Sequence, residues 1–96
     1  MKIRWTAPAL RDLEAIGDYL ERESSAAIAA RIVTTILDCV DTLADFPHKG
    51  RPGRVPDTRE LVVSNTPYVV PYRVRNVAAE ILAVFHGARR WPETFD

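Results

Sequence analysis

The sequence holds a single cysteine among its 96 residues, and it lacks any long apolar run. One cysteine, Cys39, excludes an internal disulfide and suits a reducing cytoplasm. Its place on the apolar face of a predicted helix favours plain packing over reactivity. No apolar run approaches the ~20 residues that a membrane helix needs. The first five residues enter a strand-like pattern directly, so we expect no secretory signal.

Motifs for metal, nucleotide and hydrolase chemistry are also missing. Two histidines, His48 and His86, with one cysteine do not make a usual zinc pattern, and no glycine-rich phosphate loop is present. Gly50-x-x-Gly53 is too short for such a loop and lies between prolines, which is typical of turns. Ser64 has no nucleophile-elbow motif around it. We therefore expect neither a metal nor a cofactor.

The length of the chain fits one domain, residues 1–96. Its basic and acidic side chains are equal in number, but they are unevenly spread. Residues 1–46 carry five basic and eight acidic side chains, whereas residues 47–96 carry eight basic and five acidic. This division favours one face that attracts an anionic partner. Two halves that neutralise each other explain it nearly as well.

The first part of the chain predicts a short strand and a helix. Residues 2–5 alternate between polar and apolar, and apolar residues then recur at helical spacing over residues 8–23. Thr6 is the expected N-cap, and Pro8 lies in the first turn, where its missing N–H costs nothing. Gly17, inside the helix, suggests a close approach of a second helix.

A second helix is predicted over residues 26–45. Ser24-Ser25 separates it from the first helix and offers its N-cap, and Pro47 stops it. A joint this short makes the two helices an antiparallel hairpin. The prolines and glycines of residues 47–57 predict a loop without a regular element.

Three runs rich in Val, Ile, Leu, Tyr and Phe follow, at residues 59–63, 68–74 and 80–91. Short breaks between them predict consecutive antiparallel strands, a meander. The fold class is therefore α+β, with an N-terminal strand and a helical hairpin packed on an antiparallel sheet. The first strand is expected to pair with a strand of the meander, and the tail after Trp91 to fray unless Phe95 docks. The expected core includes Leu13, Ile32, Ile36, Tyr68, Val70, Tyr72 and Val84.

Cationic side chains gather in the second half of the chain. Cleaving RNA without a metal needs an acid, a base and cations on the phosphate. His86 could be the acid or base, with Arg73 and Arg89 as the clamp. A lone histidine before a glycine is more often structural, and binding of a protein or nucleic acid through the same face explains the residues no less well. The set comprises Arg73, His86, Arg89 and Arg90 on the sheet, with Lys49, Arg51, Arg54 and Arg59 in or beside the loop.

The order and spacing of several weak motifs resemble the RelE/ParE toxins of bacterial type II toxin–antitoxin systems, also called plasmid stabilisation proteins. The likeness covers nearly the whole chain. The motifs are Ala9-Leu10-x-Asp12-Leu13-x-x-Ile16, Leu43-x-x-Phe46-Pro47-x-x-Gly50, Thr58-Arg59-Glu60-Leu61, Tyr68-Val69-Val70-x-Tyr72-Arg73-Val74 and Ile81-Leu82-x-Val84-x-His86-Gly87-Ala88-Arg89.

This resemblance implies the helical-hairpin-on-sheet fold and a cognate antitoxin that wraps the toxin. It also implies one of two activities: RelE-like members cut mRNA on the ribosome, whereas ParE-like members act on DNA gyrase. The sequence is closer to the ParE branch, because Val69 follows Tyr68 where RelE-like toxins have an arginine. After Arg89 the only aromatic residues are Trp91 and Phe95, and neither can transfer a proton.

Three hypotheses follow from the residues and the resemblance. The first is a ParE-like, cytoplasmic growth inhibitor that poisons DNA gyrase. The second is a ribosome-dependent mRNA endonuclease with His86, Arg89 and Arg73 as catalytic residues. The third is a non-toxic member that only binds antitoxin. For the first hypothesis, the target-binding set is Arg73, Arg89, Arg90, Trp91, Arg51, Arg54 and Arg59.

Overall fold

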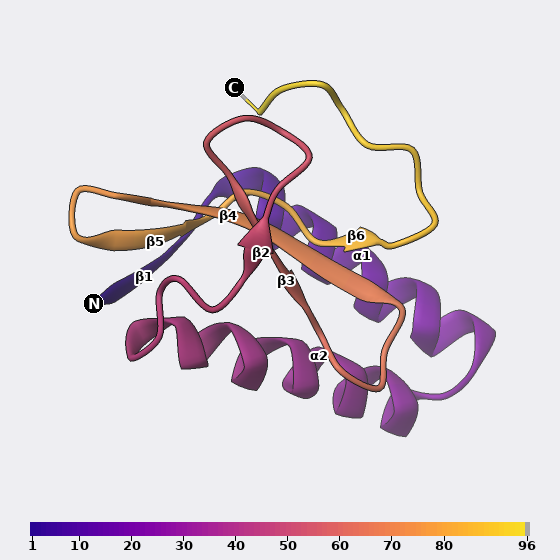
Figure 1. The fold of residues 1–96 in the computed structure, drawn as a ribbon. Coiled ribbons are helices and arrows are strands. Elements are labelled where there is room, and N and C mark those ends of the chain that lie inside the picture. Colours follow the sequence, from indigo (N-terminus) through magenta and orange to yellow (C-terminus); the bar gives the residue numbers. More distant parts are fainter. Residues whose placement is uncertain (96) are drawn as a thin grey trace.

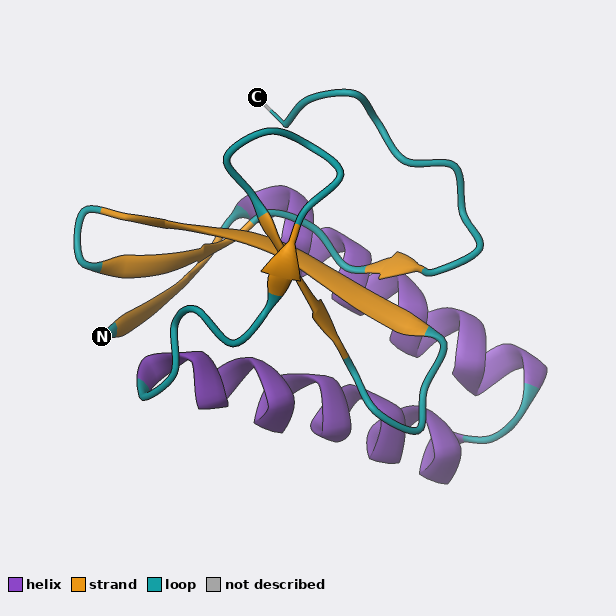
Figure 2. Ribbon diagram, in the orientation of Figure 1, coloured by secondary structure: helices purple, strands orange, loops and turns teal. Residues whose placement is uncertain are grey.

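The computed structural model describes residues 1–95. Two helices lie side by side against one face of a six-stranded sheet (Figures 1 and 2). This arrangement confirms the predicted α+β class and the helical hairpin. The elements follow in the order β1 (Lys2–Trp5), α1 (Ala7–Glu23), α2 (Ala26–Asp41), the 3-10 helix η1 (Thr42–Ala44), β2 (Arg51–Pro52), β3 (Arg59–Val62), β4 (Tyr68–Arg75), β5 (Ala78–Ile81) and β6 (Phe85–His86).

Both helices begin where the sequence places their caps. The Thr6 side chain accepts a hydrogen bond from the backbone N–H of Ala9, and Ser25 accepts one from Ile28. Each bond satisfies one of the donors that a helix start leaves free. A Cβ on Gly17 would lie 3.4 Å from a methyl carbon of Val33 on α2, so the expected close approach of the helices is present.

The second helix ends earlier than predicted. Regular α-helix stops at Asp41 rather than residue 45, and residues 42–44 continue as a tighter 3-10 turn. The Thr42 hydroxyl donates a 2.6 Å hydrogen bond to the carbonyl of Cys39. Such side-chain bonds compete with the regular helical ladder near a terminus.

The sheet has the strand order β1-β5-β4-β3-β2, with β6 also paired to β4. The first strand does return to the meander, but β1 runs parallel to β5. The expectation of a wholly antiparallel sheet is therefore wrong, and the sheet is mixed. A parallel pair needs a long crossover, and here the helical hairpin and the strands β2 to β4 supply it.

The predicted loop over residues 47–57 contains a strand. Arg51 and Pro52 pair with Glu60 and Arg59 of β3, so the expectation of no regular element fails for these two residues. Proline lacks a backbone donor but is tolerated on the outermost strand of a sheet. The strand is only two residues long, and the rest of the segment is turn or irregular.

The third predicted run, residues 80–91, divides into β5 and β6, and β5 begins two residues before it. Both strands lie along the same side of β4, and the pairing register shifts by one residue between Ile81 and Phe85. This shift is a β-bulge, which leaves an extra residue in one strand. Pro71 of β4 accepts from Leu82 at the start of the bulge. Its missing N–H therefore faces irregular backbone instead of a regular ladder.

The core lies between the helices and the sheet. Ile36, Val70 and Tyr72 are fully buried, and Tyr68 is 7% exposed, which confirms the prediction that both tyrosines face the core. Of the other predicted core residues, Leu13 and Val84 are buried, and Ile32 is half-buried against the cluster.

Cys39 is half-buried at the edge of this core. Burial raises the pKa of its thiol, and the nearby Lys49 opposes that rise only partly. A thiol with a raised pKa carries little thiolate, which agrees with the packing role predicted for it. Within residues 1–95, no helix is long and apolar enough to cross a membrane.

Candidate functional site

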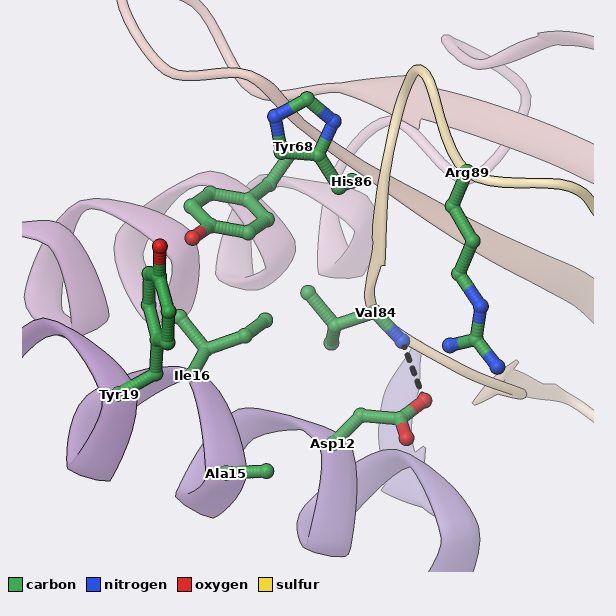
Figure 3. Close-up of a pocket in the computed structure, with 8 residues that line it drawn as sticks. All are labelled: Asp12, Ala15, Ile16, Tyr19, Tyr68, Val84, His86 and Arg89. Atoms are coloured by element: carbon green, nitrogen blue, oxygen red, sulfur yellow. Dashed lines mark hydrogen bonds between the residues drawn. The ribbon is translucent and has the colours of Figure 1, made fainter.

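A cavity of about 320 Å³ lies between α1 and the β6 end of the sheet (Figure 3). The bulge before β6 builds one wall of it: the backbone N–H of Val84, freed from the ladder, donates to the Asp12 carboxylate at 3.0 Å. Asp12 thus joins helix and sheet at the cavity. The lining residues are Asp12, Ala15, Ile16, Tyr19, Tyr68, Val84, His86 and Arg89.

His86 lies at the mouth of this cavity. Its Nδ1 accepts a 3.1 Å hydrogen bond from the backbone N–H of Ala88. In the neutral ring the proton is therefore on Nε2. The imidazole meets Tyr68 edge to face, with ring centroids 6.0 Å apart. This geometry fixes the ring and leaves Nε2 as the atom able to donate.

Arg89 and the tyrosines complete the cavity. Figure 3 shows Arg89 directed toward the Asp12 end, with Tyr19 and Tyr68 at the other end. Burial, and to a smaller extent Tyr19, raises the pKa of Tyr68. Tyr68 therefore stays a neutral phenol, which can donate a hydrogen bond but does not act as a base near neutral pH. The cavity thus offers a cation, an imidazole and phenol donors.

Arg73, the third predicted catalytic residue, does not line this cavity. Its Nε donates to Glu80 at 2.7 Å on the sheet face away from the helices, which we call the outer face. Arg4 of β1 pairs with the same carboxylate, which is buried. His86 and Arg89 are therefore brought together by the fold, and Arg73 is kept apart from them.

Two of the predicted target-binding arginines are also held by a carboxylate on the outer face. Arg51 and Arg54 donate to the two oxygens of Glu60, which is only 3% exposed. The backbone N–H of Arg54 donates to Glu60 at 2.8 Å as well. Burial would raise the pKa of Glu60, but these hydrogen bonds outweigh it and hold that pKa below its ordinary value. The arginines remain about half exposed, so they can still contact a partner with their free N–H groups.

Of the remaining predicted residues, two are held by hydrogen bonds and one is exposed. Arg59 donates to the carbonyls of His48 and Gly50, at 3.2 and 2.8 Å, and so ties β3 to the preceding loop. Lys49 donates to the Thr42 hydroxyl at the end of α2. Arg90 is exposed in the segment that follows β6.

The segment after β6 folds back toward the loop between β2 and β3 (Figure 1). Phe85 packs edge to face on Trp91 and stacks with Phe95, so the condition set for an ordered tail is met at Phe95. The guanidinium of Arg54 lies 3.8 Å from the Trp91 ring centroid, and that of Arg89 lies 4.5 Å from Phe85. The fold thus joins three predicted residues, Arg54, Arg89 and Trp91, into one cluster.

Sequence reasoning did not single out several residues that the structure places at these sites. Asp12 belongs to a motif of the first helix, but its contact with Val84 depends on a bulge that no local pattern announces. In the sequence, Tyr19 has the pattern of an ordinary exposed helix residue. On the outer face, alternation along β4 places Arg75 on the same side as Arg73, whereas only the pairing of the first strand brings Lys2 and Arg4 beside them.

The structure also bears on metal binding. In the part of the chain it describes, no three His, Cys, Asp or Glu side chains lie close enough together to hold a metal ion. A second, shallow cavity of about 410 Å³ lies in the groove between the helices. It combines an apolar floor with three carboxylates. Its lining is Leu10, Leu13, Glu14, Gly17, Asp18, Glu21, Ala26, Ala29, Ala30 and Val33.

A helical hairpin covering one face of a mixed sheet is the architecture of RelE- and ParE-type toxins. The chain superposes on the structure titled "Chromosomal ParDE TA system from P. aeruginosa" with a TM-score of 0.83 and 31% identity, covering 90% of this chain and 95% of that one. The RelBE2 toxin–antitoxin complex of Mycobacterium tuberculosis shares the fold, with a TM-score of 0.66, 23% identity and coverage of 88% and 95%.

Sequence comparison leads to the family itself. Residues 3–91 match the family described as the ParE toxin of the type II toxin–antitoxin system parDE, and this chain belongs to that family. The candidate toxin Y4kP of Sinorhizobium fredii is 50% identical over 93 residues, which cover 96% of this chain and 94% of that protein. Toxin RelE2 of Caulobacter vibrioides is 39% identical over 88 residues, which cover 92% and 97%.

Proposed function

We propose that this chain is a growth-inhibiting toxin that acts in the cytoplasm by poisoning DNA gyrase, and that a cognate antitoxin neutralises it. Membership of the ParE toxin family supports the toxin role. The observation that carries the choice of target is the separation of the three residues that a nuclease would use. Arg73 is bound to Glu80 on the outer face, whereas His86 and Arg89 line the cavity against α1.

Cleavage of RNA without a metal needs an acid and a base on the two sides of the phosphate. Among the described residues that line the cavity, His86 is the only histidine, Asp12 is engaged by Val84, and Tyr68 has a raised pKa. A single imidazole beside one cation matches a binding surface better than a two-step acid–base site. The target-binding cluster is then Arg54, Arg89 and Trp91, with Arg90 beside it.

Induction of the chain without its antitoxin tests the target. Separate labelling of DNA, RNA and protein synthesis should show that DNA synthesis stops first and that cells filament. Arg89→Ala should relieve the arrest while thermal unfolding stays similar, and Arg22→Ala, at an exposed helix position, serves as the control. Full toxicity of the Arg89 variant would count against the assigned contact surface.

A second candidate is an mRNA endonuclease, favoured by one observation: His86 and Arg89 share a cavity with two phenols. In that case protein synthesis stops first, mRNAs are cut within codons, and His86→Gln abolishes cleavage without unfolding the protein. Under the gyrase proposal the same variant stays toxic. Growth without arrest in either assay would instead favour a non-toxic member that only binds antitoxin.

We assign the groove between the helices to the antitoxin. Its floor is apolar, Leu10 is half exposed, and Glu14, Asp18 and Glu21 form an acidic border. An amphipathic helix with basic flanks fits such a groove. Leu10→Glu should therefore weaken antitoxin binding at least about tenfold, the scale of losing one buried apolar side chain, and leave toxicity intact. Leu37→Glu, outside the groove, is the matched control; equal loss in both variants would reject the groove.

A further inference from the structure

The outer face of the sheet carries a cluster of cations that none of the sites above uses. Ile3, Trp5 and Val74 pack against the core, so their alternating neighbours point to the outer face. The register places β1, β5 and β4 side by side at the end that holds the β4–β5 turn. We call the cations of this region the hairpin patch: Lys2, Arg4, Arg73 and Arg75.

Among the described residues, Glu80 is the one acidic side chain that pairs with cations of this patch. Glu80 accepts from Arg73 through one oxygen and from Arg4 through the other. Within residues 1–95, neither Lys2 nor Arg75 has an acidic side chain within ion-pair distance, and both are exposed. The patch therefore keeps three positive charges in excess, whereas Glu60 leaves only one excess charge from Arg51 and Arg54.

The cations are close enough to repel one another. Burial, and then the charges of Arg75 and Arg4, lower the pKa of Arg73. On one strand, same-face neighbours are ~7 Å apart, and β1 lies two strand spacings, ~10 Å, from β4. The excess charge is thus spread over a flat area, and a polyanion that spans it would relieve the repulsion.

We propose that the hairpin patch binds the phosphate backbone of duplex DNA. Arginine and lysine supply the sequence-independent part of such binding, through neutralised phosphates. Sheets that bind single-stranded RNA present aromatic side chains on which bases stack. The outward positions of the patch hold only Lys2, Arg4, Arg73, Arg75, Ala78 and Glu80, so backbone contact to a duplex is the better match.

Charge on the opposite side of the molecule fits this orientation. The helices α1 and α2 carry an excess of acidic over basic side chains. With the patch on the DNA, the acidic layer points away from it. This proposal deepens the proposed function, because DNA gyrase acts on duplex DNA. Binding of the patch to DNA does not depend on that function; the proposal rests on it only for the identity of the DNA that the patch meets in the cell.

Binding of purified full-length chain to a labelled duplex of about 20 base pairs, from about 50 to 200 mM salt, tests the proposal without gyrase. The double variant Lys2→Gln/Arg75→Gln should weaken binding about tenfold or more and lower the salt slope by about 1.8, or 0.9 per lost phosphate contact. Arg11→Gln/Arg31→Gln removes the same charge from exposed helix positions and should leave the slope unchanged.

Thermal unfolding of each variant shows that the fold is kept, and the single variants Lys2→Gln and Arg75→Gln should each give about half of the slope change. Equal weakening by the patch and control pairs would overturn the proposal. So would tighter, patch-dependent binding to single-stranded RNA of equal phosphate count, or to polyglutamate, which would assign the patch to RNA or to an acidic protein. A failure here leaves the labelling experiment in cells untouched, so the two proposals can fail separately.

Discussion

The two faces of the sheet are both buried near its centre, but different chemistry buries them. On the helical face, Val70 and Tyr72 pack against apolar side chains and are fully buried. On the outer face, Glu60 and Glu80 are 3% and 5% exposed, and each is held by two arginines. An arginine count from the sequence therefore overstates the cations available to a partner, because some of them neutralise carboxylates of their own sheet.

The largest effect should come from the helical face. Ile36→Ala should lower the free energy of unfolding by about 2–4 kcal/mol, because a fully buried side chain leaves a cavity in the core. Its neighbour Leu37 is 37% exposed, so Leu37→Ala should cost clearly less. Urea unfolding of both variants measures the difference, and equal losses would place the core elsewhere.

A smaller loss is expected on the outer face. Glu60→Gln should destabilise the protein by about 1–3 kcal/mol, since charge-assisted hydrogen bonds from Arg51 and Arg54 are weakened but both arginines still reach water. Glu14→Gln, on an exposed helix position, should change stability by less than about 0.5 kcal/mol. If the two variants behave alike in urea, the outer ion pairs do not contribute to stability.

The same carboxylate should make stability depend on pH. Because the folded pKa of Glu60 is below its ordinary value of 4.5, its contribution is present above pH 4.5 and is lost as pH falls toward the folded pKa. The stability gap between wild type and Glu60→Gln should therefore shrink on acidification below pH 4.5. A gap that stays constant with pH would mean that the ionised form is not favoured by folding.

Tyr72 tests one polar contact inside the apolar face. Its hydroxyl accepts from the backbone N–H of Gly50 at 2.9 Å and donates to the Pro47 carbonyl at 2.8 Å. Tyr72→Phe should cost about 1–2 kcal/mol, because it leaves these buried backbone groups unpaired. Tyr19→Phe, at a half-exposed ring, should be near neutral. Thermal unfolding of the pair would show whether the loop after α2 depends on this bridge.

The smallest effect should appear at the β4–β5 turn beside the hairpin patch, and it should be a gain. Asn76 and Val77 have φ of 53° and 55°, and Val77 is 79% exposed. A β-branched residue is strained in the left-handed region, so Val77→Gly should stabilise the protein by about 0.5 kcal/mol after the extra chain entropy of glycine. Val62→Gly, on regular strand β3, should instead destabilise it. A loss at Val77 would mean that its side chain makes a contact that outweighs the strain.

Local patterns were enough to predict both helices and the strands β1, β3 and β4. Thr6 and Ser25 mark where the two helices begin, because caps and helical periodicity act over a few positions. The parallel pairing of β1 and the bulge before β6 depend on partners distant in sequence, and no short window contains them. The edge strand at Arg51 was not predicted, because the prolines around it are typical of a loop.

The site was less predictable than the fold. Glu60 and Glu80 each precede a buried apolar residue, in a pattern that exposed strand residues also show. The sequence alone therefore did not show that Arg51, Arg54 and Arg73 would be paired with them. Lys2 and Arg75 were not predicted as site residues, because only the strand register brings them together. His86 and Arg89 line one cavity, and their closeness in the chain made that placement predictable.

The parallel pairing of β1 with β5 has a consequence for how the chain folds during synthesis. Residues 2–5 cannot find their partners until residues 78–81 have been made. Until then the helical hairpin has no complete sheet to pack on, and its apolar face stays open. Contacts of such long sequence separation slow folding relative to helical proteins, and they leave the growing chain exposed to aggregation. The sheet of this chain therefore cannot be completed until residues 78–81 have emerged from the ribosome.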